Sequence, residues 1–343
     1  MSTSVGSKHS AGFPVSLAKP GRRVAGVIAM LALIGPATAD WHGESRPMMG
    51  TEVSVHLWHD DPVEAEALIE AVFAEASRID HLMSTYKDTS RISAVNREAA
   101  DRPVYAGNEL FGLVRRALDI SVLTRGAFDI TYDSVGQHYD FRARKRPDDE
   151  TVAAERGLID YRLVELDDTA QSIRFVKQGV RINLGGIAKG YVVERGVDIL
   201  RHRGVTNAIV TAGGDSRMLG DRRGQPFMIG IRDPRRAEAV AMSVPLEDEA
   251  VSTSGDYERY FDENGIRYHH IISPSTGAPA HELTSATVFG PDAVMTDALS
   301  TSVFVMGVDL GLRLIAGLPD YESIVIDGEG RIYYSDGLQP PER

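Results

Sequence analysis

Asp297 and Thr301 carry side-chain oxygens at a spacing that could hold a metal ion. They are four residues apart in "VMTDALSTSVFVMG", so a helix would place the carboxylate and the hydroxyl on one face. Both are hard oxygen ligands, and Mg²⁺ takes few of these from a protein while it keeps places for water and substrate phosphate. The spacing is also common where Asp lies in a first helical turn and Thr bonds back to a helix carbonyl. Spacing alone therefore leaves the metal site open.

His269 and His270 are adjacent in "RYHHIISPSTG", where a strand would point the two rings to opposite faces. One ring could then enter a cleft while the other is packed or solvated. A neutral imidazole in a cleft can accept a proton from a hydroxyl nucleophile near pH 7. The alternative, a strand histidine held by a structural hydrogen bond, is the commoner role for a lone histidine, and "SPSTG" is then simply a turn.

The stretch "INLGGIAKGY", residues 182–191, reads as a strand that turns tightly into a helix. Gly185 and Gly190 have the outer spacing of a phosphate-binding P-loop. Lys189 precedes the second glycine and Tyr191 follows it, however, whereas a P-loop places Lys and then Ser or Thr after that glycine. The dinucleotide pattern Gly-x-Gly-x-x-Gly is also missing. Two adjacent glycines still let a ligand approach the backbone closely at the start of a helix, where N–H groups point outward.

Two aromatic residues and two carboxylates lie in segments that allow more than one interpretation. Phe128 in "GAFDI" and Tyr86 in "MSTYKDTS" could each stack on a flat ring or cover the core. Asp129 is expected at the surface beside Phe128, and Asp215 in "AGGDS" is expected in a turn, where it could cap or orient. "TSGDY" has ordinary loop composition. A Ser-His-Asp hydrolase is poorly supported, because the chain has no Gly-x-Ser-x-Gly.

The elements that must position these groups come as runs of strands with helices between them. Alternating apolar residues after Thr51 predict a strand, and Asp61 followed by Pro62 predicts the start of a helix. Further helices are expected from Asn108 to about Gly126, after the double glycine to about Gly204, over 293–306 and over 309–318. Further strands are expected at 161–166, 172–176, 180–184, 207–212, 227–233, 240–246, 267–272 and 285–290, with a hairpin at 323–335 and a loop at 84–96. This order favours an α+β fold over a doubly wound one, with no repeat and no domain boundary after residue 40.

The overall composition excludes one class of partner. The 343 residues are 43% hydrophobic and 25% charged, as in an ordinary folded globule. The formal net charge is -12 and there is no long Lys/Arg run. This argues against nucleic-acid binding, because few cationic side chains are available to displace the counterions of the phosphate backbone. An anionic ligand would therefore need local help from a cation, a helix terminus or a metal.

The first 39 residues have the pattern of a secretion signal. Arg22 and Arg23 precede the apolar run "VAGVIAMLALIG", and "ATA" precedes Asp40 as a small-x-small cleavage site. The run is short for a membrane span. We expect a soluble, exported protein in the periplasm, with a retained N-terminal anchor as the alternative and no transmembrane span in residues 40–343. The absence of Cys excludes a disulfide, a thiol nucleophile and a lipid on an N-terminal Cys.

Taken together in this order, the motifs resemble the ApbE family of FAD:protein FMN transferases. The matching segments span nearly all of residues 40–343: "MMGT", "STYKDTSRIS", "GAFD", "INLGGIAKGY", "AGGD", "IGIRDP", "TSGDYERYF", "HHIISPSTGAP" and "TDALSTSVFVMG". The resemblance implies one large α+β transferase domain over 40–343, with mixed and antiparallel sheets, interspersed helices and two lobes around a flavin cleft.

The resemblance also implies a reaction. In a Mg²⁺-dependent step, a Thr or Ser hydroxyl of an exported or membrane-bound electron-transfer protein, such as a quinone-reductase subunit, would attack the flavin-side phosphorus of FAD. FMN would become joined to that acceptor, and AMP would leave. By position, His270 matches the family's general base, and Mg²⁺ would be held by the backbone oxygen of Gly186 and the side chains of Asp297 and Thr301. The residues expected to contact FAD are Met49, Tyr86, Ala127, Phe128, Asp129, Asn183, Lys189 and Ile272.

The chain departs from the family pattern in three places. Asn183 stands where the family usually has Asp in "DLGG", so an amide replaces a carboxylate there. "ISPSTG" replaces the commoner "IDPRTG", which removes an acid and a base together, and the missing Cys excludes the lipid-anchored form. Two other functions stay open: a Mg²⁺-dependent FAD pyrophosphatase in which water replaces the acceptor hydroxyl, and an exported FAD-binding protein without chemistry.

Overall fold

The computed structural model describes residues 39–236 and 239–338, which form one compact unit. The expected secretion signal lies outside these residues except for Ala39. The helices are α1 (Pro62–Met83), α2 (Arg91–Glu98), α3 (Asn108–Leu123), α4 (Asp133–Gly136), α5 (Asp149–Glu155), α6 (Ala188–His202) and α7 (Ala293–Ala316). The first strands are β1 (Asp40–Met48), β2 (Thr51–His59), β3 (Val104–Tyr105), β4 (Val164–Asp167), β5 (Ser172–Phe175), β6 (Ala208–Ala212), β7 (Asp215–Leu219) and β8 (Phe227–Arg232). The others are β9 (Val240–Leu246), β10 (Ala250–Gly255), β11 (Tyr260–Glu263), β12 (Ile266–His269), β13 (Leu283–Gly290), β14 (Glu322–Asp327) and β15 (Ile332–Tyr334).

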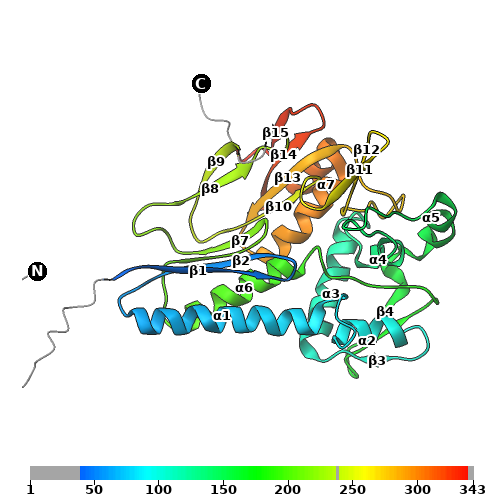
Figure 1. Cartoon of the computed structure of the whole chain (residues 1–343), viewed down its shortest axis with the longest axis horizontal. Helices are drawn as coiled ribbons and strands as arrows, with labels where there is room; N and C mark the ends of the chain where they lie inside the picture. The colour runs from blue at the N-terminus through cyan, green and yellow to red at the C-terminus, as the bar shows by residue number, and fades with distance from the viewer. Residues whose placement is uncertain (1–38, 237–238, 339–343) are drawn as a thin grey trace, which may run out of the picture. The chain divides into compact units, whose positions relative to one another are not determined.

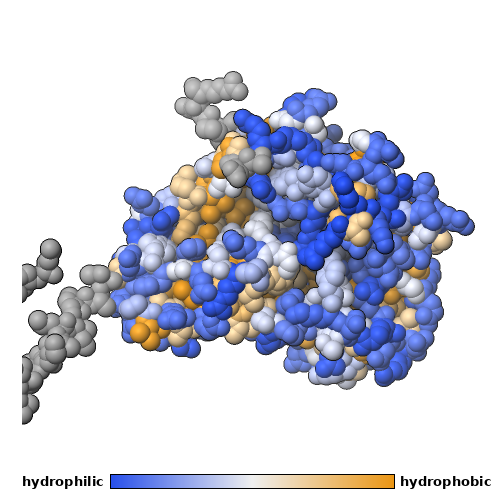
Figure 2. All heavy atoms as spheres, viewed as in Figure 1, coloured by the Kyte–Doolittle hydropathy of each residue, from blue (hydrophilic) through white to orange (hydrophobic). Residues whose placement is uncertain are grey.

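The main sheet has eight antiparallel strands in the order β1-β2-β6-β7-β10-β13-β14-β15. Helices α1, α6 and α7 pack against one face of it (Figure 1). Toward the opposite face, Phe227 and Leu246 of the β8–β9 hairpin pack with Met218 and Val251 of the sheet. Figure 2 shows apolar side chains gathered beside this hairpin. The sheet is therefore covered on both faces by separate apolar clusters.

The second half of the fold is mostly helical and contains its own small sheet. Strands β3, β5 and β4 pair in that order and pack with α2 and α3 around a core that includes Ile92, Leu110 and Ile173. The segment that leads into α6 also contributes to this core, through Ile182 and Leu184. Mixed helices and antiparallel sheets confirm the expected α+β class.

Local signals account for the first elements after residue 40. Val53, Val55 and Leu57 alternate along β2 and are fully buried against α1 and α6. The Asp61 side chain accepts hydrogen bonds from the backbone N–H groups of residues 63 and 64 and caps α1, with Pro62 at the first helical position. These predictions are confirmed.

Helix α7 joins the two helices expected at 293–306 and 309–318. Gly307 has φ 77° and ψ -176°, a conformation that only glycine adopts easily, and it kinks the helix between them. Among the described residues, α7 is the one helix long and apolar enough in sequence to cross a membrane. Half of its most apolar window is buried inside the protein, and α7 packs on β10, β13 and α6. Burial within the fold thus accounts for its composition.

Several local predictions are wrong, including the turn expected at Asp215, which instead begins strand β7. The expected loop at 84–96 contains α2, which begins where the Ser90 hydroxyl accepts a hydrogen bond from the Ser93 N–H at 3.1 Å. The expected strand at 180–184 is irregular, because the Asn96 amide bonds both the N–H and the carbonyl of Ile182 at 2.9 Å and replaces a strand partner. "TSGDY" is only partly a loop, since Thr253 lies in β10 at the centre of the main sheet.

Candidate active site

A cavity of about 340 Å³ lies where the main sheet and the helical half meet. Its wall combines the β1–β2 turn, the loop after α1, the segment before α4, the turn before α6, the end of β10 and the side of α7. All twelve site residues expected from the sequence line this one cavity: Met49, Tyr86, Ala127, Phe128, Asp129, Asn183, Gly186, Lys189, His270, Ile272, Asp297 and Thr301. The fold thus brings together residues that are as far apart in the chain as 49 and 301. Their individual roles remain predictions.

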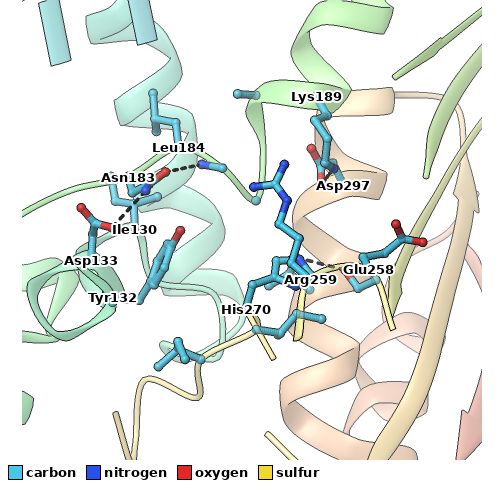
Figure 3. Close-up of a pocket in the computed structure, with 18 of the residues that line it drawn as sticks. Ile130, Tyr132, Asp133, Asn183, Leu184, Lys189, Glu258, Arg259, His270 and Asp297 are labelled. Atoms are coloured by element: carbon cyan, nitrogen blue, oxygen red, sulfur yellow. Dashed lines mark hydrogen bonds and ion pairs between the residues drawn. The ribbon is translucent and has the colours of Figure 1, made fainter. Parts of the chain in front are cut away.

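One side of the cavity carries a lysine held between two buried carboxylates. Lys189 Nζ lies 3.3 Å from Asp297 Oδ1 (Figure 3). The same ammonium also pairs with Asp215. Burial and the nearby Asp297 raise the pKa of Asp215 to about 7, although Lys189 opposes this rise. Burial alone would lower the pKa of Lys189, but the two carboxylates raise it above its usual value. Lys189 is therefore a partly buried cation with its charge already compensated.

Asp297 and Thr301 face the cavity together from α7. Asp297 Oδ2 accepts a hydrogen bond from the Gly190 N–H at 2.9 Å and so caps α6, whose N-cap residue Ile187 supplies no side-chain acceptor. Thr301 Oγ1 lies 3.2 Å from the Ser254 hydroxyl and does not bond back to its own helix within the described residues. Asp297 also lies beyond the first turn of α7. The ordinary helical interpretation of this pair is therefore wrong.

Gly186 lies directly opposite Thr301. A Cβ built on Gly186 would lie 3.5 Å from Thr301 Oγ1 and 3.2 Å from Phe128 Cε2. Residues that supply a carboxylate, a hydroxyl and a backbone carbonyl thus line the same cavity, and hard oxygen donors of this kind suit Mg²⁺. Among the described residues, no cluster of three or more His, Asp or Glu side chains could hold a metal. A metal in this cavity would rely on the mixed donor set around Asp297.

The Asn183 side chain fixes the turn that carries the two glycines. Its Oδ1 accepts a hydrogen bond from the Gly185 N–H at 2.8 Å, and its Nδ2 donates to Asp133 Oδ1 at 3.0 Å and to Thr85 Oγ1 at 3.2 Å (Figure 3). Asp133 also forms an ion pair with Arg181 at 2.6 Å, yet burial raises its pKa above the ordinary value. Asn183 therefore stabilises the turn through an amide that faces a buried carboxylate.

The two adjacent histidines point to opposite sides, as expected. His269 is 1% exposed: its Nε2 donates to the Ala280 carbonyl at 2.6 Å, and its ring packs edge-on against Phe304. Burial lowers its pKa to about 4. His270 faces the cavity, and its Nδ1 is buried without a hydrogen-bond partner in the part of the chain that the structure describes. Burial, followed by the charge of Arg259, lowers the pKa of His270 to about 3, so this ring is neutral at pH 7.

Three residues expected near a flavin differ sharply in exposure. Tyr86 is 87% exposed and lines the cavity, so it does not cover the core. Phe128 is 3% exposed and belongs to the helical half's core, which agrees with the core interpretation of this ring. Asp129 was expected at the surface, but it is 6% exposed. Its Oδ1 accepts from the Thr131 hydroxyl and its Oδ2 from the Tyr161 N–H, so capping of a short helical turn explains its burial.

Met49 and Ile272 complete the expected flavin contacts. Met49 has a positive φ of 53° in the β1–β2 turn and packs partly against the helical core. Ile272 is buried and forms an isolated bridge with Pro279. Sequence reasoning missed the cavity residues Tyr132 and Arg259. The available signal for Arg259 was its place in "TSGDYERYF", in the loop between β10 and β11.

The model of the ApbE family matches residues 49–325, which is most of the chain. The chain belongs to the ApbE family. It is 31% identical over 286 residues to the FAD:protein FMN transferase of Klebsiella pneumoniae, covering 82% of this chain and 88% of that protein. It is 29% identical over 323 residues to the FAD:protein FMN transferase of Treponema pallidum, with 89% of each protein covered.

Solved structures of the family share the fold. The crystal structure of the ApbE protein from Thermotoga maritima matches with a TM-score of 0.81 at 33% identity, covering 87% of this chain and 98% of the other. The flavin transferase ApbE from Vibrio cholerae matches with a TM-score of 0.77 at 27% identity, over 87% of this chain and 98% of that structure. The resemblance inferred from the motifs is confirmed for the family and for the fold.

Proposed function

We propose that this ApbE-family protein transfers FMN from FAD to a Thr or Ser hydroxyl of an exported or membrane-bound electron-transfer protein, with Mg²⁺, and releases AMP. Membership in the family and the names of its relatives in K. pneumoniae and T. pallidum support transferase chemistry. The observation that carries the proposal is the unpartnered, neutral ring of His270 in the same cavity as the oxygens of Asp297 and Thr301.

The transfer exchanges one phosphorus–oxygen bond for another. The acceptor hydroxyl oxygen forms a bond to the flavin-side phosphorus, and the bond from that phosphorus to the bridging oxygen breaks. The bridging oxygen keeps the electron pair and leaves as part of AMP. The hydroxyl proton passes to a ring nitrogen of His270, which is neutral and therefore able to accept it.

A base with a pKa of about 3 is weak, and the substrate itself would correct this. FAD brings two phosphate charges into the cavity that His270 faces. Negative charges near an imidazole favour its protonated form and raise its pKa. His270 thus becomes a stronger base once FAD is bound. It would therefore accept the hydroxyl proton efficiently only in the FAD complex.

Mg²⁺ would be held by the Asp297 carboxylate, the Thr301 hydroxyl and the Gly186 carbonyl, whose residues meet in the cavity. When bound there, the ion would neutralise phosphate charge and assist the departure of AMP. The exposed ring of Tyr86 offers a face on which a flat heterocycle can stack. Asn183 holds the glycine turn in place for close approach of the ligand.

Export to the periplasm is part of the same proposal. Its support is the sequence pattern of Arg22 and Arg23, the apolar run and the small residues before Asp40. An exported enzyme of this kind would act on acceptor domains outside the cytoplasm. Cell fractionation of the full-length chain, with detection of a protein that begins at Asp40 in the periplasmic fraction, tests this point, and retention in the cytoplasm would contradict it.

One incubation separates transfer from its alternatives. Residues 40–343 are mixed with FAD, MgCl₂ and an exported domain that carries a candidate acceptor Thr. Flavin fluorescence on the acceptor band supports transfer, whereas free FMN and AMP alone indicate hydrolysis, and unchanged FAD indicates binding without chemistry. Asp297→Ala should abolish turnover. Asp309→Ala, an exposed carboxylate on the same helix, is the matched control and should keep full activity.

A further inference from the structure

The cavity contains only a small amount of uncompensated positive charge. Its lining includes Lys189, His270 and Arg259 as the groups that could carry a positive charge. Lys189 is held by Asp215 and Asp297, and His270 is neutral at pH 7. Within the described residues, Arg259 forms no ion pair with any carboxylate. A dianionic ligand that enters this cavity therefore meets one protein cation whose charge is not already compensated.

The contacts of Arg259 leave most of its guanidinium donors free. Its Nη2 donates to the Gly50 carbonyl at 3.2 Å, across the cavity mouth from the β10–β11 loop to the β1–β2 turn. The side chain makes no other hydrogen bond in the part of the chain that the structure describes. The neighbouring Glu258 pairs instead with Arg232 at 3.3 Å. Figure 3 shows Arg259 extending into the pocket beside His270.

Arg259 is also tied to His270 through the backbone. The His270 N–H donates to the Arg259 carbonyl at 3.1 Å, so the loop that carries the guanidinium is fixed to the residue directly after strand β12, which carries the imidazole. A guanidinium that contacts a phosphate from this position would place the phosphorus within reach of the His270 side of the cavity. The glycine at position 50 keeps room for this side chain, because a Cβ there would lie 3.2 Å from Arg259 Nη2.

We propose that Arg259 binds the diphosphate of FAD, and that its guanidinium exchanges the neutral Gly50 carbonyl for charged phosphate oxygens. This inference rests on the proposed function for its substrate. Hydrogen bonds from a guanidinium to phosphate are charge-assisted and often bidentate, so they are stronger than the contact with a carbonyl. Arg259 thus selects dinucleotides and phosphorylated flavins over riboflavin, which lacks a phosphate.

The test compares ligands that share the flavin ring and differ in phosphate. Affinities of residues 40–343 for FAD and for riboflavin are measured by flavin fluorescence, without an acceptor protein. Arg259→Met should weaken FAD binding by roughly 10- to 100-fold and leave riboflavin binding unchanged. Arg259→Lys keeps the charge but loses the planar guanidinium, so its affinity for FAD should lie between those of the unmodified protein and Arg259→Met. Arg162→Met removes an exposed guanidinium that lies outside the cavity and should change neither affinity.

Two outcomes would overturn the role of Arg259. Equal losses of FAD and riboflavin affinity would mean that the side chain only holds the Gly50 turn in place. Unchanged FAD affinity in Arg259→Met would mean that the diphosphate lies elsewhere. If Arg259→Met fails to fold, the comparison is made between the unmodified protein and Arg259→Lys, where a loss for FAD alone supports the proposal and equal affinities contradict it. Because binding is measured without an acceptor, a failure of transfer activity would leave these outcomes readable.

Discussion

Lys189 Nζ lies 3.3 Å from Asp297 Oδ1 while the same ammonium pairs with Asp215. The carboxylate that would bind Mg²⁺ is thus already in contact with a protein cation. A metal ion at Asp297 must compete with this ammonium, and Asp215 gives Lys189 a partner that it keeps when Asp297 changes ligand. This arrangement predicts that substitutions of Lys189 and of Asp215 change the affinity for Mg²⁺ in opposite directions.

Lys189→Met should tighten Mg²⁺ binding in the absence of FAD, by severalfold. The variant leaves Asp215 and Asp297 as buried carboxylates without a cation, so it should also unfold more readily, by about 3 kcal/mol. Isothermal titration with MgCl₂ measures the first effect and urea unfolding the second. Lys177→Met, at an exposed lysine, is the control and should alter neither.

Asp215→Asn should have the reverse effect on the metal. With its second partner neutral, Lys189 is left with Asp297 alone and holds that carboxylate more tightly. The dissociation constant for Mg²⁺, measured by the same titration, should rise severalfold. If Lys189→Met and Asp215→Asn shift the affinity in the same direction, competition between the ammonium and the metal is not what sets it.

Asn183→Asp should destabilise the protein more at high pH than at low pH. The new carboxylate would face Asp133 Oδ1, which now accepts a hydrogen bond from the Asn183 amide at 3.0 Å. Two carboxylates at this distance share one proton, so one folded-state pKa rises above its unfolded value. Stability contributed by that proton is present at low pH and is lost as pH rises through the raised pKa.

We expect Asn183→Asp to lower the free energy of unfolding by about 2 kcal/mol at pH 8 and by clearly less at pH 5. Urea unfolding at both pH values measures this difference. The double exchange Asn183→Asp with Asp133→Asn restores one amide opposite one carboxylate and should recover most of the loss. An equal loss at both pH values would show that repulsion between carboxylates is not the cause.

Elements with strong local signals could be predicted from the sequence alone. The strand after Thr51 and the helices that begin near residues 62, 108 and 188 carry apolar periodicity together with caps or glycine stops. The kink at Gly307 also matches the gap between two predicted helices. In each case the signal lies within a few residues of the element that it determines.

The missed elements depend on partners that are distant in the sequence. Strands β7 and β10 lie at the centre of the main sheet, yet their sequences, "DSRML" and "AVSTSG", are too polar to predict buried strands. Their polar side chains are satisfied across the fold, as where the Ser252 hydroxyl meets the Thr296 hydroxyl at 2.9 Å. The strand predicted at 180–184 is wrong for the same reason, since its backbone partner is the distant side chain of Asn96 in place of a neighbouring strand.

The candidate site followed from the order of the motifs, since no single spacing was decisive. Asp297 with Thr301, or His270 alone, had an ordinary structural explanation until many segments matched one family together. The role of Arg259 could not be predicted from the sequence, because it depends on the absence of a carboxylate partner for its guanidinium among the described residues. Asp129 was misplaced because its burial depends on the Tyr161 N–H, 32 residues further on.

The free energy of unfolding should fall as pH drops below about 6.5, partly because of His269. Its folded pKa of about 4 lies below the ordinary value of 6.5, so the unfolded chain binds the extra proton first. Stability from the neutral ring is therefore full above 6.5 and is lost as pH falls toward 4, by about 3 kcal/mol.

His269→Gln should reduce this acid dependence, because glutamine can donate to the Ala280 carbonyl without titrating. Part of the dependence should remain, because the folded pKa of His270 is also low, at about 3. Urea unfolding of the variant and the unmodified protein between pH 4 and 8 gives the comparison. His202→Gln, at an exposed histidine on α6, serves as the control and should keep the steep profile. If His269→Gln is as acid-sensitive as the unmodified protein, the buried ring does not contribute to the loss.

His270→Gln should bind FAD with unchanged affinity and transfer FMN roughly 10²- to 10⁴-fold more slowly, the usual contribution of a general base. Slower transfer with unchanged FAD affinity would support the role of His270 as the general base.

The pH dependence of the reaction tests the role of His270 independently. For free enzyme, the pKa of His270 is about 3, so kcat/KM for FAD should show no acid limb between pH 5 and 8. In the FAD complex, the phosphate charges raise that pKa, so the acid limb of kcat should lie at higher pH than that of kcat/KM. Rates of acceptor flavinylation measured from pH 5 to 9, on protein shown by circular dichroism to be folded at each pH, decide the point. An acid limb near 6.5 in kcat/KM would mean that burial does not hold the pKa of the free ring low, and identical limbs in both parameters would mean that the imidazole does not sense the bound diphosphate. An unchanged transfer rate in His270→Gln would mean that the imidazole does not take the hydroxyl proton.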